Sequence, residues 1–189
     1  AFLRSGETGI SRLLLEVSGT DSPVACEVRR VGDKRFEGTI VMPGVISVEA
    51  VELEGFHFTA VRLEGIIHLI WDGKRMDGRK AEELLKRVAP KMPEPAAGLL
   101  QWDEERGFMT PLVCVPGSDT LVWETGCGSG STAIGAWKAG KCPGETVTEI
   151  NQPGGKIRVT VSREMGQRER ISMTGQVHIL GEHRLHSLS

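Results

Sequence analysis

Alternation of apolar and polar residues is the feature that most constrains the fold of this 189-residue chain. A two-residue period puts apolar side chains on one face of a β-strand, so each alternating run predicts a half-buried strand. Such runs occupy residues 12–19, 24–32, 35–44, 45–73, 157–161 and 170–182. Breaks at Gly55 and Gly65 divide the longest run, which predicts three consecutive antiparallel strands there. We therefore expect antiparallel sheet to dominate the fold.

Two segments have helical periodicity instead. Asp77 is placed to cap the first helix, and Pro90 ends it. One face of that helix is apolar and carries Ala81, Leu84, Leu85 and Val88. The second helix follows Cys127 and has no charged residue before Lys138. A helix with so little polar surface is expected to lie inside the strands, so the predicted fold class is α+β, with a central helix and a second helix outside.

Composition excludes several classes of function. Hydrophobic residues make up 39% and charged residues 25%, which is typical of a soluble globular protein. The formal net charge is −2 and no long basic run occurs, so neither nucleic acid nor an anionic membrane surface is an expected partner. No apolar stretch approaches the roughly 20 residues of a membrane helix, and no signal-peptide pattern is present. These features predict a cytoplasmic location.

The four cysteines are Cys26, Cys114, Cys127 and Cys142. They contain no C-x-x-C pair and do not combine with histidines at the spacing of a zinc site, so no metal site is expected. Disulfide-dense secreted domains are usually much shorter than this chain. We expect free thiols, most of them small core residues.

Cys127 is different because a glycine- and serine-rich helix start follows it. The first N–H groups of a helix have no intrahelical partner and carry the positive end of the helix dipole. This position predicts a thiolate with a pKa below the usual value of about 8.5. It also predicts that a carboxylate docks on the N–H groups of Gly128, Ser129 and Gly130. An amino acid held there would present its α-carbon to the sulfur, whereas the alternative is an ordinary packed cysteine before a buried helix.

Several segments resemble the second half of diaminopimelate epimerases. In "VWETGCGSGSTA" (122–133), a strand end similar to that family's E-R-G is followed by a sequence similar to its C-G-T-G, whose cysteine is one of two acid/base thiols. The segment "VELEGFHFTAVRLEGIIHLIWDG" (51–73) is similar to the strands that end in the family's G-N-P-H. "QPGGKIRVTV" and "ISMTGQVHILGE" are similar to its closing strands. The chain thus resembles this family in the family's order.

The resemblance implies a diaminopimelate-epimerase-like fold of two lobes, each an antiparallel β-barrel around a central helix. Residues 1–43 would be the remaining part of an incomplete N-terminal lobe, and 44–176 the C-terminal lobe with the Cys127 helix. Residues 177–189 would be a final strand and tail returning to the N-terminal lobe. The family's other cysteine, in a C-G-N motif, has no counterpart here, so the resemblance implies a missing N-terminal segment upstream of Ala1 that carries it.

The function implied by the resemblance is cofactor-independent racemisation or epimerisation of an amino acid, without pyridoxal phosphate. One thiol removes the α-proton while the other delivers a proton to the opposite face. Cys127 would be one of these thiols, and Glu124 would assist its deprotonation or hold the substrate's amine. His68, which matches the family's histidine, would serve the other thiol. A core histidine and an ordinary strand-end carboxylate are the structural alternatives.

The chain departs from the family's pattern at the substrate-binding positions. Ile66 stands where the family has asparagine, and Thr125 where it has arginine, the two residue types that hold the distal carboxylate of diaminopimelate. A different substrate is therefore implied, such as histidine or another amino acid with a small or cationic side chain. Glu124 favours a cationic group. The spacing leaves open whether Glu124 matches the family's first or second glutamate.

Two other classes of function stay open. Because the first cysteine motif is absent, the chain could be a non-catalytic binding module or subunit that keeps the fold. A one-base relative, such as a proline-racemase-like dehydratase or a phenazine-pathway isomerase, would exchange or eliminate without inversion. The resemblance is also compatible with a homodimer.

Overall fold

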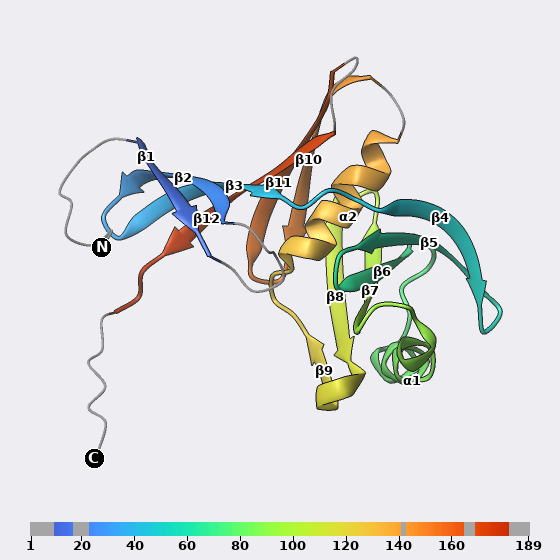
Figure 1. The fold of residues 1–189 in the computed structure, drawn as a ribbon. Helices are drawn as coiled ribbons and strands as arrows, with labels where there is room; N and C mark the ends of the chain where they lie inside the picture. The colour runs from blue at the N-terminus through green and yellow to red at the C-terminus, as the bar shows by residue number, and fades with distance from the viewer. Residues whose placement is uncertain (1–9, 17–22, 141–142, 165–168, 182–189) are drawn as a thin grey trace.

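A computed structural model describes residues 10–16, 23–140, 143–164 and 169–181 (Figure 1). These residues form twelve strands, two α-helices and two short 3-10 turns. The first half contains β1 (Ile10–Leu15), β2 (Val24–Gly32), β3 (Arg35–Met42), β4 (Ser47–Leu53), β5 (Phe56–Leu63), β6 (Ile66–Trp71), α1 (Gly78–Val88) and the turn η2 (Ala89–Lys91). The second half contains β7 (Ala96–Asp103), β8 (Phe108–Val115), the turn η3 (Pro116–Ser118), β9 (Thr120–Trp123), α2 (Gly128–Ala139), β10 (Gly144–Gln152), β11 (Gly155–Arg163) and β12 (Arg170–His178).

All twelve strands belong to one sheet. Its order is β1-β2-β3-β12-β11-β10-β8-β7-β6-β5-β4, and β9 pairs with β8. The predicted antiparallel run β4-β5-β6 is confirmed by its register. Gly55 and Gly65 make the turns between these strands with φ of 78°, a left-handed conformation that favours glycine.

The sheet differs from the expected antiparallel barrels in two pairings. Strands β6 and β7 are parallel, and so are β8 and β10 where Asn151 meets Phe108. The reason is the connection: α1 lies between β6 and β7 in sequence, and β9 with α2 lies between β8 and β10. A crossover of this kind returns the chain in its original direction. The described strands form one continuous sheet with β1 and β4 at its edges, and the expected division into two barrels stays a prediction.

The predicted lobe boundaries remain predictions. β3 lies between β2 and β12, whereas β4, which follows it in sequence, forms the far edge of the sheet. Figure 1 shows β1, β2 and β3 extending to the left, away from both helices. Residues 1–9 and 182–189, which belong to the expected first and last segments, lie outside the described residues.

The α1 prediction is confirmed. The Asp77 carboxylate accepts hydrogen bonds from the N–H groups of Arg79 and Lys80, which caps the helix. The buried face consists of the expected residues Ala81, Leu84, Leu85 and Val88. None of the helices in the described part of the chain is long and apolar enough to cross a membrane.

The central part of the sheet is covered on both faces. Leu69 and Leu99 belong to the core around α1, while Ile70 and Leu100 belong to the core around α2. Successive side chains of a strand point to opposite faces, so β6 buries nearly its whole length. This explains why "IIHLIW" is apolar except at His68 instead of alternating, and the strand turns His68 towards the side of α2.

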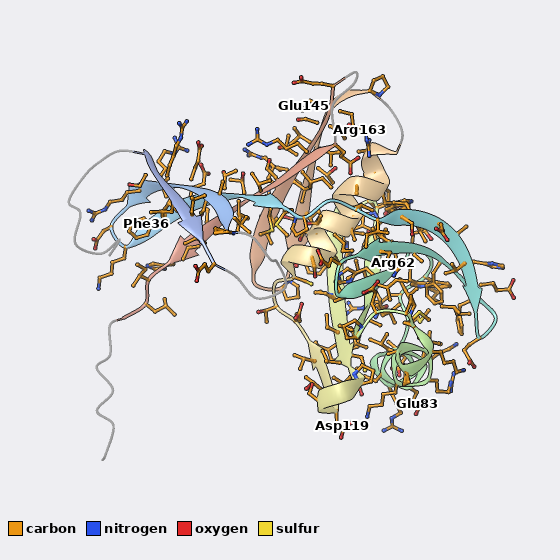
Figure 2. The ribbon with its side chains drawn as sticks, in the orientation of Figure 1. Phe36, Arg62, Glu83, Asp119, Glu145 and Arg163 are labelled. Atoms are coloured by element: carbon orange, nitrogen blue, oxygen red, sulfur yellow. The ribbon has the colours of Figure 1, made fainter. Side chains whose placement is uncertain are left out.

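Helix α2 is central, as predicted. It packs against β10, β11 and β12 on one side and against β5 and β6 on the other. Gly135 allows the close approach to β11, because a Cβ at this position would lie 2.4 Å from Cγ1 of Val159. Figure 2 places Arg163 beside the C-terminal end of the helix, where its guanidinium donates to the carbonyl of Ala139 at 3.3 Å. A cation there complements the negative end of the helix dipole.

Candidate active site

Cys127 is the N-cap of α2. Its backbone is extended, with φ −125° and ψ 109°, and its Sγ accepts a hydrogen bond from the N–H of Gly130 at 3.3 Å. The residue is 4% exposed. Gly130 leaves room for its neighbours, because a Cβ there would lie 2.9 Å from Cδ2 of Leu100 and 3.1 Å from the cysteine sulfur. The glycine-rich sequence therefore lets the sulfur fold back onto the first turn of the helix.

The helix start retains donors for an anion. Among the described residues, no acceptor pairs with the backbone N–H of Gly128 or Ser129. Gly130, the third donor expected from the sequence, is already engaged by the Cys127 sulfur. The site therefore offers two adjacent N–H groups to a carboxylate, next to a sulfur.

Ser129 links Cys127 to His68. The Ser129 hydroxyl lies 3.6 Å from Cys127 Sγ and 2.9 Å from His68 Nε2. The sequence separates His68 and Ser129 by 61 residues, and the β6 register brings them together by turning His68 towards α2. The structure thus joins two of the predicted catalytic residues through one of the predicted binding residues.

His68 is fully buried and neutral. Its Nδ1 has no hydrogen-bond partner in the described part of the chain, and its ring lies over Gly98 on β7. A Cβ at Gly98 would lie 2.2 Å from Nδ1, so this glycine provides the space for the ring. Burial lowers the pKa of His68 to about 3. If the unpaired Nδ1 is the unprotonated nitrogen, Nε2–H donates to Ser129 and leaves the Ser129 proton for the sulfur.

Glu124 lies in the short connection between β9 and α2. Its backbone N–H donates to the carbonyl of Pro111 at 3.0 Å, and its half-buried carboxyl group is one of the groups that raise the pKa of the Cys127 thiol. Burial, followed by this carboxyl group, raises the pKa of Cys127 to about 12, against the lowering effects of Ser129 and the Gly130 N–H. The lowered thiol pKa predicted from the helix start is therefore wrong for this structure. Removal from water and a neighbouring carboxylate outweigh the helix start, and the thiol stays protonated at neutral pH.

Thr125 is exposed, and its backbone holds the connection in place. The Thr125 carbonyl accepts a hydrogen bond from Gly154 in the β10–β11 turn at 2.6 Å. Its predicted contact with substrate stays a prediction.

Two buried polar residues at this site were not predicted. The Gln152 Oε1 accepts from the Cys127 N–H at 2.7 Å, and Gln152 Nε2 donates to the Ser131 hydroxyl at 2.9 Å. The Ser131 hydroxyl donates in turn to the Cys127 carbonyl at 2.7 Å. The available signal was the period of β10: Gln152 shares the inward face with Ile150, where a polar side chain needs a buried partner.

The other cysteines lie elsewhere. Cys26 on β2 and Cys114 on β8 are buried free thiols, as expected, and Cys142 is outside the described residues. Cys114 belongs to the core around α1, while Cys127 belongs to the core around α2. In the part of the chain that the structure covers, no three His, Cys, Asp or Glu side chains gather as metal ligands would.

This architecture is similar to those of two solved structures. A predicted epimerase from Pseudomonas aeruginosa matches with a TM-score of 0.58 and 14% identity, over 96% of this chain and 70% of its own. A hydroxyproline epimerase from Agrobacterium vitis, solved with bound trans-4-hydroxy-L-proline, matches with a TM-score of 0.59 and 12% identity, over 94% of this chain and 60% of its own. At these identities the likeness shows the fold alone.

The chain belongs to the family described as the histidine racemase CntK N-terminal domain, whose model matches residues 3–186. A histidine racemase from Fusobacterium nucleatum is 27% identical over 173 residues, which are 89% of this chain. The chain spans 63% of the length of that curated relative. The racemase/epimerase fold inferred from the sequence is thus confirmed, while the family is the histidine racemase family and not specifically that of diaminopimelate epimerase.

Proposed function

We propose that this protein is part of a cofactor-independent amino-acid racemase in which Cys127 is one of two acid/base thiols. The observation that supports it most directly is the geometry at α2, where the Cys127 sulfur lies beside two N–H groups without acceptors among the described residues. Membership in the histidine racemase family supports the same class of reaction.

Inversion proceeds through two proton transfers on opposite faces of the α-carbon. A thiolate facing Cys127 takes the α-proton, and the electron pair of the broken C–H bond spreads into the substrate carboxylate. The N–H groups of Gly128 and Ser129 stabilise the charge that develops there. The Cys127 S–H then donates its proton to the other face, which leaves Cys127 as thiolate and its partner as thiol. Starting from the other enantiomer, the two sulfurs exchange roles.

The neighbours of Cys127 determine which proton form it takes. Glu124 raises the pKa of the resting thiol and would take up its proton when Cys127 acts as base. The Ser129 hydroxyl stabilises the thiolate, and His68 orients that hydroxyl. Thr125, which is exposed in the connection between β9 and α2, would contact the substrate.

Histidine is the substrate we propose. Curated relatives bear the name histidine racemase, and Glu124 provides a carboxylate that suits a cationic group on the substrate. Ile66 and Thr125 do not carry the side chains that would hold a second carboxylate, which disfavours diaminopimelate.

A deuterium-exchange experiment tests the proposal. The intact protein is incubated in deuterated water with L-histidine, L-proline, trans-4-hydroxy-L-proline and diaminopimelate, and loss of the α-proton is followed by NMR. We expect exchange on histidine with appearance of D-histidine, and loss of both in Cys127→Ala. Retained activity in Cys127→Ala would exclude the role of this cysteine.

A one-base reaction is the second candidate. Cys127 is the one cysteine that the described residues place at a helix start, and a single base can exchange a proton on one face only. Exchange without the D-isomer, or elimination, would favour this reaction. Absence of exchange on every substrate, with Cys127 reduced, would favour a binding module.

A further inference from the structure

We propose that Gln152 is a positioning residue for Cys127, so that the β10–β11 turn sets the place and direction of the reactive sulfur. This inference rests on the function proposed for Cys127 and deepens it. It assigns a role in the reaction to a side chain that the mechanism above does not use.

The first observation is a closed ring of hydrogen bonds around the Cys127 residue. Gln152 accepts from the Cys127 N–H and donates to Ser131, and Ser131 donates to the Cys127 carbonyl. Gln152 is 5% exposed and Ser131 is fully buried, so water does not compete for these bonds. Both polar groups of the Cys127 main chain are therefore held by two side chains that also hold each other.

The second observation is that the same turn holds the preceding residues. The Gly154 N–H donates to the Thr125 carbonyl at 2.6 Å, and a Cβ at Gly154 would lie 2.9 Å from that oxygen. Gln152 and Gly154 thus fix the connection before α2 at two points, two residues apart. The exposed Thr125 and Gly126 lie between β9 and the helix without a strand partner of their own.

Together these contacts decide how the donors at the helix start are used. Gln152 satisfies the Cys127 N–H, and the Cys127 sulfur satisfies the Gly130 N–H. The N–H groups between them, those of Gly128 and Ser129, remain for a carboxylate. Without Gln152, the Cys127 N–H would compete for the same anion and the peptide could rotate, which would move the sulfur relative to the α-carbon.

A matched pair of substitutions separates positioning from folding. Gln152→Met removes both hydrogen bonds and nearly preserves side-chain volume. Gln101→Met is the control, because Gln101 is also 5% exposed and also accepts from a buried backbone N–H, that of Met76, at 2.8 Å. Both variants lose a bond from a buried backbone N–H, and Gln152→Met also loses the bond to Ser131, so both melting temperatures should decrease, that of Gln152→Met the more.

The activity readout uses the α-proton exchange assay in the intact protein. We expect kcat of Gln152→Met to fall on the order of 10- to 100-fold with a smaller change in KM, since misplacing a reacting group by about 1 Å has effects of this size. Gln101→Met should keep the wild-type kcat. Equal kcat values for the two variants would overturn the proposal.

A second readout does not depend on the proposed reaction. Iodoacetamide alkylation of Cys127 is followed by peptide mass spectrometry between pH 7 and 10, in wild type and in both variants. We expect Gln152→Met to shift the Cys127 profile and accelerate its alkylation severalfold, because a released connection exposes the thiol. Two outcomes together would refute the proposed function and leave the positioning role standing. In the first, neither the wild type nor any variant exchanges an α-proton. In the second, the Cys127 alkylation profile shifts in Gln152→Met. An unchanged profile in folded Gln152→Met overturns the positioning role itself.

Gln152→Glu supplies a further test if the methionine variant does not fold. It retains an acceptor for the Cys127 N–H and allows the Ser131 hydroxyl to donate to it. We expect Gln152→Glu to fold and to place Cys127 correctly. Its kcat should exceed that of Gln152→Met. If Gln152→Met is insoluble, Ser131→Ala takes its place as the comparison variant. A kcat of Gln152→Glu no higher than that comparison variant would contradict the role of the Cys127 N–H bond.

Discussion

At the scale of single residues, the site is organised around a cysteine that keeps its proton. The Cys127 thiol is buried and faces Glu124, and both effects raise its pKa. A neutral thiol is the form needed to protonate a planar intermediate, whereas the thiolate form needs the help of Ser129 and the Gly130 N–H. The proposed catalysis by Cys127 therefore depends on its pKa, which Glu124 raises and which Ser129 and the Gly130 N–H lower.

Replacing Glu124 should shift that balance. Glu124→Gln removes the negative charge beside the sulfur, so we expect the pKa of Cys127 to fall towards its ordinary value and alkylation at pH 8 to become faster. The measurement is the pH dependence of Cys127 alkylation by iodoacetamide. Glu105→Gln, at an exposed turn position, is the control and should leave the profile unchanged. An unchanged profile in Glu124→Gln would contradict the role of the carboxylate.

His68 should make the protein less stable in mild acid. The unfolded chain takes up a proton near pH 6.5, but the buried His68 does so only near its pKa of about 3. Between these values the unfolded state binds one more proton, so stability falls as pH falls. At about 1.4 kcal/mol per pKa unit, lowering the pH from 7 to 5 should reduce the free energy of unfolding by about 2 kcal/mol through this residue.

Urea unfolding at pH 7 and pH 5 measures this contribution. His68→Gln should reduce the loss of stability between the two pH values by about 2 kcal/mol, because glutamine does not titrate there. His57→Gln is the matched control, since the side chain of His57 is 84% exposed. If both variants lose stability with pH as the wild type does, His68 is not held neutral by the fold.

At the scale of elements, local pattern determined what the sequence could predict. Asp77 and the apolar face of α1, the charge-free α2 and the glycine turns of β4–β6 all depend on neighbours within a few residues. The parallel pairings depend on the crossovers through α1 and α2, which no local period encodes. The predicted Cys127 pKa was wrong for the same reason: the helix start is local, while the burial that outweighs it comes from distant strands. The role of Gln152 had only a weak signal in the sequence, which was a single polar residue on the inward face of β10.

The contact between α2 and β11 permits a test at this scale. Gly135→Ala would increase helix propensity by up to about 1 kcal/mol. However, the added Cβ would lie 2.4 Å from the fully buried Val159, and overpacking of this kind costs about 1–3 kcal/mol. We expect a net loss of stability of about 1–2 kcal/mol in urea unfolding.

Gly78→Ala provides the comparison for Gly135→Ala. Gly78 also lies in a helix, but a Cβ there would make one ordinary contact, at 3.9 Å from Trp123. This variant should be neutral or slightly stabilising. If Gly135→Ala were as stable as the wild type, α2 would not pack against β11 as closely as described.

At the scale of the whole molecule, one sheet carries two separate cores, and the cysteines are divided between its parts. Cys127 lies in the core around α2, Cys114 in the core around α1, and Cys26 on β2 in the group of strands β1–β3. Burial raises the pKa of both Cys26 and Cys114, and neither is placed at a helix start. The fold therefore gives the three described thiols different environments, and Cys127 is the one among them that lies at a helix start.

This division predicts that the thiol facing Cys127 is neither Cys26 nor Cys114. We expect Cys26→Ala and Cys114→Ala to keep racemase activity within about twofold once corrected for folded fraction, and Cys127→Ala to lose it by several orders of magnitude, as expected for removal of an acid/base group. The measurement is α-proton exchange from L- and D-histidine in deuterated water, with melting temperature as the check on folding. The two enantiomers matter because each uses a different sulfur as base. A Cys26→Ala or Cys114→Ala variant that is folded but exchanges the proton of only one enantiomer would identify that cysteine as the second thiol, and would require the group of strands β1–β3 or the α1 core to rearrange towards α2.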